Sequence, residues 1–541
     1  MPILSLNRNL KLLLALALGA SVGGPLVHAQ VPKPKSLEEF VAYMQAHHKA
    51  PFDREGAVLP PGGQQLLLQR MTKLGNPSMA SIAAAASTST GTNVKVNRDR
   101  NPWPKAEIGL AVDPVNGNDF VVMSNDFREN YDHQFFHVST NGGTSWSDDS
   151  MVIAVDPITD FAPYNFQSDP GVAFDDKSQS YLSTIAGNLI LDFNVEGVYA
   201  NFDTQVEEVQ GFANGTYASL VPTIVDNQPC SGATNFVCPA QLDKPFITVD
   251  AVSGSPTNGT IYVYYTLFCN DQPCIDGNAK VAPFSSAILE SHAAGANLPF
   301  SPPVLVSGSF AQDQFSSMVI DSHGTPHIFF DDFTASNGVI RMRMSTLRNG
   351  KWQVTSTPVA RFFYNGLNSL NWGFRDFGTV APGCGIVNDT AYCAFSASQI
   401  VGGLLEGTPS VYLAVVNTQT GASTVHRVNN DPFGNGRHHF FPWATAKSDG
   451  SVYVGWYDDR NDPFLTKVEY FVGKSTDGGS TFPTQQAVST KSFNPCVGFP
   501  GCGFFGDYTQ IAAGPDGVVH AAWADTRDGA SMQIYTQAIT W

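Results

Sequence analysis

Residues 139–146 read STNGGTSW and residues 475–482 read STDGGSTF, so the chain repeats one eight-residue turn at two distant places. Each turn follows a short run of alternating side chains, FFHV at residues 135–138 and YFVG at residues 470–473. Alternation with a period of two predicts a half-buried β-strand. A glycine pair after a strand predicts a tight hairpin, because glycine adopts positive φ without steric cost. The two stretches therefore predict equivalent hairpins in a repeated β-fold.

The third and eighth positions of each turn have predicted structural roles. The side chain of Asn141 or Asp477 is placed to accept hydrogen bonds from backbone N–H groups of its own turn. The aromatic residue that ends each turn, Trp146 or Phe482, is expected to pack between neighbouring sheets. We expect these four side chains to stabilise the fold.

The composition agrees with an all-β protein. The 541 residues include 49 Gly and 35 Pro, aromatic residues make up 11%, and only 14% of residues are charged. A chain rich in turn formers and aromatic residues but poor in helix formers is typical of a β-sandwich, barrel or propeller. The net charge of -17 argues against a nucleic acid or an anionic membrane as partner.

The N-terminus resembles an export signal. Arg8 and Lys11 precede an apolar run at residues 12–18, and Val27-His28-Ala29 offers a small-residue cleavage site. The apolar run is too short to span a bilayer, and no later segment qualifies. We therefore expect residues 1–29 to be removed and the mature chain to be a secreted or periplasmic monomer.

The eight cysteines form four close pairs, which in an exported protein predict four disulfides that each close a short loop. Zinc binding is the weaker alternative, because the pairs lack the usual spacing and nearby histidines. The predicted disulfides are Cys230–Cys238, Cys269–Cys274, Cys384–Cys393 and Cys496–Cys502.

Residues 30–92 are expected to form a separate helical segment and linker. Ser36 and Glu39 make a capping box in front of residues 40–48, and residues 63–74 have apolar side chains at helical spacing. The stretch at 80–92 is rich in Ala, Ser and Thr and is typical of a linker.

From residue 93 to 541 the chain repeats with a period of about 60 to 75 residues, which fits four strands and their loops. This pattern predicts a β-propeller of four-stranded antiparallel blades, with seven blades counted and six as the alternative. Residues 93–96 are placed to supply the outer strand that the last copy lacks. The seven copies begin near Glu107, Asp169, Lys244, Phe315, Phe377, His438 and Phe504.

The two turns resemble the Asp-box, or bacterial neuraminidase repeat, of sialidase-like β-propellers. The resemblance covers residues 106–541 as architecture and the two turns as specific motif. It implies a retaining glycosidase with three arginines on the substrate carboxylate, a Tyr nucleophile activated by a Glu, and an Asp acid/base. The chain lacks the family's Arg-Ile-Pro tripeptide, and no Glu stands in a matching motif, which weakens the implied activity.

Three copies end their second strand with an Asp followed two residues later by an Arg, and a fourth offers Asp331-Asp332 without Arg. The groups could bind an anionic sugar and donate a proton. Alternatively, each pair fixes a loop within its own blade. The candidate catalytic residues are Asp126, Asp331, Asp458 and Asp525, and the candidate substrate-binding residues are Arg128, Arg375, Arg437, Arg460 and Arg527.

The sequence thus leaves two functions open for a glycan-directed propeller. One is an exo-acting glycoside hydrolase of sialidase type, and the other is a non-catalytic propeller that binds carbohydrate or protein. The expected partner is a glycan or glycoconjugate. No cofactor is expected, although Asp-rich loops could hold structural Ca²⁺.

Overall fold

A computed structural model describes most of the chain from residue 93 onward. The described residues are 93–99, 103–129, 131–147, 149–152, 154–156, 162–164, 166–187, 190–191, 198–199, 202–210, 218–219, 223–228, 240–270, 273–296, 298–335, 337–364, 374, 376–403, 405–499, 502 and 504–541. The predicted signal, helical segment and linker lie outside the described residues, as do Cys230, Cys238 and Arg375.

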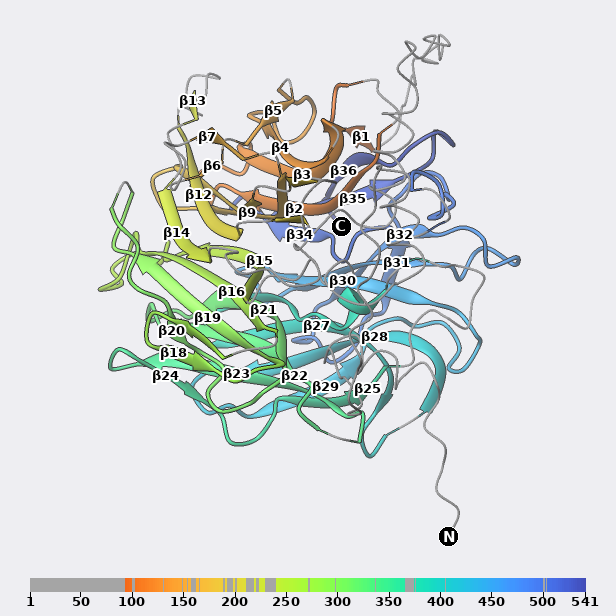
Figure 1. Ribbon diagram of the computed structural model, residues 1–541. Helices are drawn as coiled ribbons and strands as arrows, with labels where there is room; N and C mark the ends of the chain where they lie inside the picture. Colours follow the sequence, from red (N-terminus) through yellow and green to blue (C-terminus); the bar gives the residue numbers. More distant parts are fainter. Residues whose placement is uncertain are drawn as a thin grey trace, which may run out of the picture.

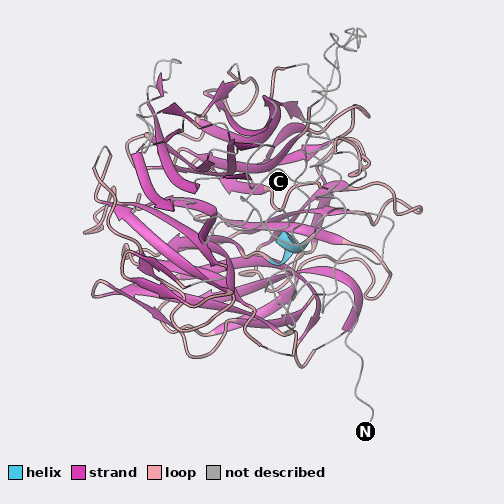
Figure 2. Cartoon of the chain, in the orientation of Figure 1, coloured by secondary structure: helices cyan, strands magenta, loops and turns pink. Residues whose placement is uncertain are grey.

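The described part of the chain is all-β. It contains no α-helix, and its one helical element is the short 3₁₀ helix η3 at Phe377–Val380 (Figure 2). No helix in this part is long and apolar enough to cross a membrane. All pairs of named strands are antiparallel, as the alternating sequence pattern predicts.

Three four-stranded sheets follow the order of the chain from their first strand to their fourth. Their strands are β2 (Lys105–Val112), β3 (Phe120–Glu129), β4 (Tyr131–Ser139) and β5 (Ser150–Met151); β15 (Ala240–Val249), β16 (Ile261–Cys269), β19 (Ser285–Ala293) and β20 (Val304–Leu305); and β30 (His439–Ala446), β31 (Val452–Asp458), β32 (Glu469–Ser475) and β33 (Thr484–Ala487).

Another sheet pairs β8 (Phe166–Phe174), β9 (Ser180–Gly187), β12 (Phe202–Gln210), β13 (Ala218–Ser219) and β14 (Thr223–Gln228). The largest sheet has nine strands, because β25 (Ala360–Phe363) joins two groups that each follow the chain. The groups are β21 (Asp313–Ile320), β22 (Pro326–Asp332), β23 (Ile340–Arg348) and β24 (Lys351–Val354), and β26 (Gly383–Val387), β27 (Thr390–Ile400), β28 (Leu405–Asn417) and β29 (Ser423–Arg427).

The two ends of the repeated region meet in one sheet. β1 (Val94–Lys95) pairs with β36 (Gln533–Ile539), which continues through β35 (Val519–Asp525) to β34 (Gln510–Ala513). The prediction that residues 93–96 supply the outer strand of the last copy is confirmed. Pairing the first strand with the last joins chain segments more than four hundred residues apart.

The first strands of these groups form a closed ring. Each of β2, β8, β15, β21, β26, β30 and β34 contacts the next, and β34 contacts β2 (Figure 1). Aromatic and aliphatic side chains fill the space between adjacent sheets, as in the cluster that joins Trp456 and Phe471 of one sheet to Leu413 of its neighbour. The arrangement of antiparallel sheets is propeller-like.

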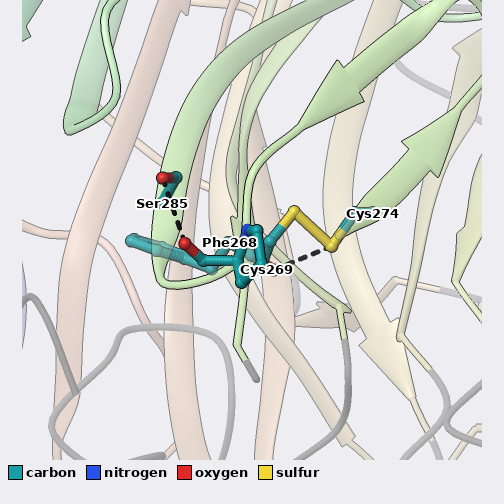
Figure 3. Close-up of a disulfide and its surroundings, with 5 residues drawn as sticks. Phe268, Cys269, Cys274 and Ser285 are labelled. Atoms are coloured by element: carbon teal, nitrogen blue, oxygen red, sulfur yellow. Dashed lines mark hydrogen bonds between the residues drawn. A yellow bond between two sulfur atoms is a disulfide. The ribbon is translucent and has the colours of Figure 1, made fainter. Parts of the chain in front are cut away.

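Three small hairpins and three disulfides complete the described elements. The hairpins are β6 (Val155–Asp156) with β7 (Ala162–Pro163), β10 (Ile190–Leu191) with β11 (Val198–Tyr199), and β17 (Cys274–Asp276) with β18 (Ala279–Val281). Three predicted disulfides are confirmed: Cys269–Cys274 (Figure 3), Cys384–Cys393 and Cys496–Cys502.

The two turns that decided the sequence interpretation have the same hydrogen bonds. Asp477 Oδ1 accepts from the Thr481 backbone N–H at 2.9 Å, and Asn141 Oδ1 accepts from the Ser145 backbone N–H at 3.0 Å. The glycine pairs have positive φ, with 70° at Gly478 and 84° at the residue that follows it. The predicted turn geometry is confirmed at both places.

Candidate active centre on the ring axis

A bulge distorts the first strand in five of the sheet groups. At each bulge one non-glycine residue adopts positive φ, between 50° and 59°. Such a conformation costs about 1–3 kcal/mol, and a bulge redirects the side chains next to it. In three bulges the residue is charged, and these residues are Glu107 of β2, Asp169 of β8 and Lys244 of β15. The bulges bring the three charged groups together on the inner side of the ring.

Lys244 connects acids from two other sheets. Its Nζ lies 3.3 Å from Asp507 Oδ2 and 3.8 Å from Asp169 Oδ1, and all three residues are buried. The same Nζ lies 4.9 Å above the ring of Tyr508. Hydrophobic surroundings strengthen these charge interactions, because the effective dielectric constant is lower than in water.

A hydrogen-bond network extends from this ion pair to two further acids. Asn125 Nδ2 donates to Glu107 Oε2 and, at 3.0 Å, to Ser168 Oγ. Ser168 Oγ in turn donates to Asp132 Oδ2 at 2.9 Å. Asn125 Oδ1 accepts from the backbone N–H of Asp169 at 3.1 Å. The Asn125 side chain therefore connects the Glu107 carboxyl group to the Asp169 backbone and, through Ser168, to the Asp132 carboxyl group.

We call this set the axial cluster. It combines four acids, one lysine and one tyrosine with two uncharged residues that connect them, and it draws on four sheets. Its members are Glu107, Asn125, Asp132, Ser168, Asp169, Lys244, Asp507 and Tyr508.

Two groups of the axial cluster have strongly shifted pKa values. Burial, with additional repulsion from Asp169 and Asp126, raises the pKa of Asp132 well above its ordinary value. Its Oδ1 makes no hydrogen bond in the described part of the chain. Burial, followed by the charge of Glu107, raises the pKa of Tyr508 well above 10. The cluster therefore combines one carboxyl group whose pKa is raised with acids that form ion pairs.

Aromatic side chains surround the same centre. Phe246 of β15 contacts two other aromatic rings. Its ring lies 5.1 Å from that of Tyr508, in the segment before β34, and 6.0 Å from that of Trp443 on β30. Gly378 of η3 lies so close to Asp507 that a Cβ atom there would overlap the Asp507 backbone. The narrow packing fixes the positions of the Asp507 and Tyr508 side chains.

In each of the three predicted Asp–Arg pairs the arginine is bound by the acid of its own motif. In each pair the acid accepts from the backbone N–H of the arginine with one oxygen and from its Nε with the other, at 2.8–2.9 Å. These contacts hold the loop after the second strand within one sheet. The pairs are Asp126–Arg128, Asp458–Arg460 and Asp525–Arg527.

Each of these guanidinium groups also packs over an aromatic ring of the third strand of its own sheet. The distances from the guanidinium carbon to the ring centroid are 4.1 Å for Arg128, 4.6 Å for Arg460 and 4.1 Å for Arg527. A stacked, bidentate arginine is held more firmly than an exposed one. The geometry supports the interpretation that each pair fixes its own loop, and substrate binding by these arginines stays a prediction.

Asp332, rather than its predicted neighbour, has this structural role in the fourth copy. Its Oδ2 lies 2.7 Å from Arg343 Nε, and its Oδ1 accepts from the backbone N–H of Thr334. Asp331 is fully buried on the other side of the strand, and neither of its oxygens has a hydrogen-bond partner among the described residues. Burial and the charge of Asp332 raise its pKa well above the ordinary value. Of the four predicted acids, Asp331 is thus held by no arginine.

Arg437 is half-buried and donates from Nη1 to the carbonyl oxygen of Asp462 at 2.6 Å, so it connects two loops of one sheet. The axial cluster was missed by the sequence analysis, although the starts of three copies were placed at Glu107, Asp169 and Lys244. The sequence signal for the cluster is a charged residue at the same position of three successive inner strands. The next inner strand has the apolar residue Phe315 at that position.

No protein-family model matches the chain, and no curated protein matches it. Several solved structures resemble its fold. They include the Hadza microbial sialidase Hz136 (10% identity, TM-score 0.42, covering 83% of this chain and 92% of that one) and the Penicillium chrysogenum α-L-arabinanase bound to arabinobiose (10%, 0.39, 83% and 97%). The NanB sialidase of Streptococcus pneumoniae is a third (10%, 0.37, 82% and 70%). At these values the similarity assigns no role to any residue, and the chain is similar to these proteins in fold alone.

Proposed function

We propose that this chain is a glycan-directed glycoside hydrolase whose active centre is the axial cluster. The observation that carries the proposal is the convergence of Glu107 and Asp132 of one sheet with Lys244 of β15 and Tyr508 of the segment before β34. Burying charged groups costs desolvation free energy, which ion pairing often does no more than offset. Such a cluster is therefore not explained by a contribution to the stability of the fold. Titratable groups with strongly shifted pKa values gather at functional sites more often than elsewhere.

The chemistry divides between two sides of the cluster. Asp132, whose pKa is raised by burial, would donate its proton to the leaving oxygen as the glycosidic bond breaks. The Tyr508 oxygen would form the new bond to the sugar while Glu107 accepts the phenolic proton. Water, deprotonated by Asp132, would then displace the sugar from the tyrosine, and Glu107 would return the phenolic proton. Two displacements retain the configuration of the sugar.

This division corresponds to the Tyr–Glu pair and the Asp acid that the sialidase resemblance implies. The finer assignment, an exo-acting enzyme of sialidase type that accepts an anionic sugar, rests on that resemblance. Within the described part of the axial cluster the cationic group is Lys244, which already faces Asp169 and Asp507.

Covalent labelling tests the proposed roles. An activated fluorosugar of the matching glycoside should trap the intermediate, and mass spectrometry of the digested protein should place the label on Tyr508. The Tyr508→Phe variant should lose the label, whereas Tyr535→Phe, which alters a tyrosine outside the axial cluster, should keep it. Label on another residue, in a protein that turns the substrate over, would remove Tyr508 from the mechanism.

A propeller that binds glycan without hydrolysing it is the second candidate. It is favoured by the Asp–Arg pairs, because each arginine is already bound by the acid of its own motif. This alternative predicts glycan binding without turnover, and it predicts that Tyr508→Phe leaves the affinity unchanged.

Further parts of the assignment rest on the sequence and the sheet pattern. We propose seven blades, each built on one strand of the inner ring, with the two matching turns as Asp-boxes. We also propose that residues 1–29 are an export signal, residues 30–92 a helical segment and linker, and residues 93–541 the propeller of a secreted or periplasmic monomer.

A further inference from the structure

Two arginines stand directly opposite each other on neighbouring strands of the nine-stranded sheet. Arg341 is the second residue of β23, and it pairs with Arg361 of β25 in the antiparallel register. Residues paired in this way have their Cβ atoms about 4.5–5.5 Å apart on one face of the sheet. Burial alternates along both strands: Met342 and Phe362 are buried, whereas Arg341 is half-buried and Arg361 is exposed. The two arginines therefore share the face of the sheet that is turned away from the core.

Neither guanidinium group is bound by an acid. Within the part of the chain that the structure describes, Arg341 and Arg361 form no ion pair and no side-chain hydrogen bond. Asp332, which pairs with Arg341 in the register, is bound by Arg343 instead, with 2.7 Å between Oδ2 and Nε. Ion pairs with Asp are formed by Arg128, Arg343, Arg427, Arg460 and Arg527.

An arginine pair of this kind destabilises the sheet unless an anion lies between the two groups. Like charges that are directly opposite each other on neighbouring strands repel. The chain has 47 Asp and Glu against 30 Lys and Arg, so acids are plentiful, yet none of the described ones is placed here. A guanidinium group binds a carboxylate through two parallel hydrogen bonds, a geometry that the planar carboxylate matches. The pair is thus suited to the carboxylate of a ligand.

The neighbouring positions on the same face suit a sugar ring. Phe363 lies two residues after Arg361 on β25 and is directly opposite Gln399 of β27. Phe363 is half-buried and belongs to none of the apolar clusters of the described residues. The Gln399 side chain has no hydrogen-bond partner in the same part of the chain. An aromatic ring packs against the apolar face of a sugar, and a side-chain amide hydrogen-bonds its hydroxyl groups.

The arginine pair is separate from the axial cluster but lies toward the same face of the ring. No member of the axial cluster comes from the strands β21 to β25. Arg341 is the second residue of the third strand in its group, as Asp132 is in the group that begins with β2. Because the groups repeat around the ring, equivalent positions lie toward one face.

We propose that Arg341 and Arg361 bind the carboxylate of an acidic glycan, with Phe363 against the sugar ring and Gln399 hydrogen-bonded to it. The ligand is a glycan on the strength of the proposed function, whereas its carboxylate is inferred from the arginine pair. The site would hold a second portion of a glycan chain, away from the bond that the axial cluster cleaves.

Binding of polygalacturonate, a chain of sugars that each carry a carboxylate, tests the site by isothermal titration calorimetry. In about 0.05 M salt, where screening is weak, the original protein should bind it and should bind its methyl ester at least about tenfold less tightly. Arg341→Gln and Arg361→Gln should each weaken binding by about tenfold, as expected for the loss of a hydrogen bond between charged groups. Phe363→Ala should weaken it as well. Arg348→Gln, at the exposed far end of β23, removes the same charge and should bind as the original protein does.

Thermal unfolding shows that the variants are folded. Tm of Arg341→Gln and Arg361→Gln should equal or slightly exceed that of the original protein, because each change removes repulsion. Unaltered affinity in both variants, or equally tight binding of the methyl ester, would overturn the proposal. An equal loss in Arg348→Gln would show that the polymer responds to the general surface charge. Unaltered affinity in Phe363→Ala would reduce the site to one for a bare anion.

The same titrations in Tyr508→Phe, which retains the arginine pair, separate this proposal from the proposed hydrolase. Binding that depends on Arg341 and Arg361, in a protein that hydrolyses no glycoside, would support the site and contradict the hydrolase. Hydrolysis by a protein whose polygalacturonate binding ignores both arginines would do the reverse.

Discussion

Lys244 Nζ lies 3.3 Å from Asp507 Oδ2, and this ion pair joins two sheets that are not neighbours in the ring. Lys244 belongs to β15, whereas Asp507 precedes β34. Three inner strands (β21, β26 and β30) lie between them in one direction around the ring, and two (β8 and β2) in the other. The pair therefore crosses the ring axis. It connects the first half of the repeated region to its last copy and lies at the middle of the axial cluster.

Replacing Lys244 with Met should leave Asp507 and Asp169 without their cation. Breaking a buried ion pair on one side costs about 3–5 kcal/mol, so the free energy of unfolding in urea should fall by that amount. Lys280→Met, at an exposed position of β18, should change it by less than about 0.5 kcal/mol. The double variant with Asp507→Asn should lose less than the sum of the single variants. Additive losses would show that the two groups do not interact.

Arg460→Ala should destabilise the protein without altering the chemical step. The change removes a bidentate contact with Asp458 and a stack on Phe471, so a loss of about 2 kcal/mol is expected. Rates of glycoside hydrolysis measured well below Tm should remain within a factor of about two. A KM raised by about tenfold with Tm unaltered would instead place Arg460 at the substrate, as the sequence predicted.

His439 should make stability depend on pH. Burial alone lowers its pKa, but Asp458 and Asp431 more than offset this effect, so the pKa of the folded state lies above 6.5. Stabilisation by protonated His439 is complete below the pKa of the unfolded chain and is lost as pH rises through the higher folded value. The Tm difference between the original protein and His439→Gln should therefore be largest below about pH 6.5, the unfolded value, and should shrink as the pH rises above it. A Tm difference that stays constant with pH for His439→Gln would contradict the account.

Asp331→Asn should stabilise the protein, increasingly so at higher pH. The folded pKa of Asp331 is raised, so the original protein loses stability as pH rises from about 4, the unfolded value, up to the folded value. The amide does not titrate, and the Tm advantage of the variant should grow over that range and then level off. Equal Tm values at all pH values would mean that the carboxyl group is not held in its neutral form. If Asp331 is also the proton donor, as the sequence predicted, hydrolysis should fall by about 10²–10⁴.

The repeated elements of the fold could be predicted because each depends on local chemistry. The turns at 139–146 and 475–482 contain the glycines and the capping side chain that their geometry requires, and three of the predicted disulfides join residues close in sequence. The closing pair of β1 and β36 could be inferred because the last copy lacked a strand. The residues that determine the turns and the disulfides are close together in the chain. The β1–β36 pair supplies the strand that the last copy lacks.

The axial cluster could not be predicted in the same way. Glu107, Asp169 and Lys244 share a position within successive copies, but only the ring places them side by side, and only the bulges direct them inward. The Asp–Arg motifs were easier to see because both residues stand in one loop. That closeness also explains their geometry, since an arginine two residues from an acid reaches it before it reaches another sheet.

The most direct test of the central claim is the hydrolysis of a panel of 4-methylumbelliferyl glycosides, with the sialic-acid and arabinose derivatives included. The mature protein, Asp132→Asn and Arg460→Ala would be compared below their Tm values. The account predicts turnover of at least one glycoside by the original protein, a loss of about 10²–10⁴ in Asp132→Asn, and near-normal rates in Arg460→Ala. Turnover that persists in Asp132→Asn, or no turnover of any glycoside by the original protein, would contradict an active centre at the axial cluster.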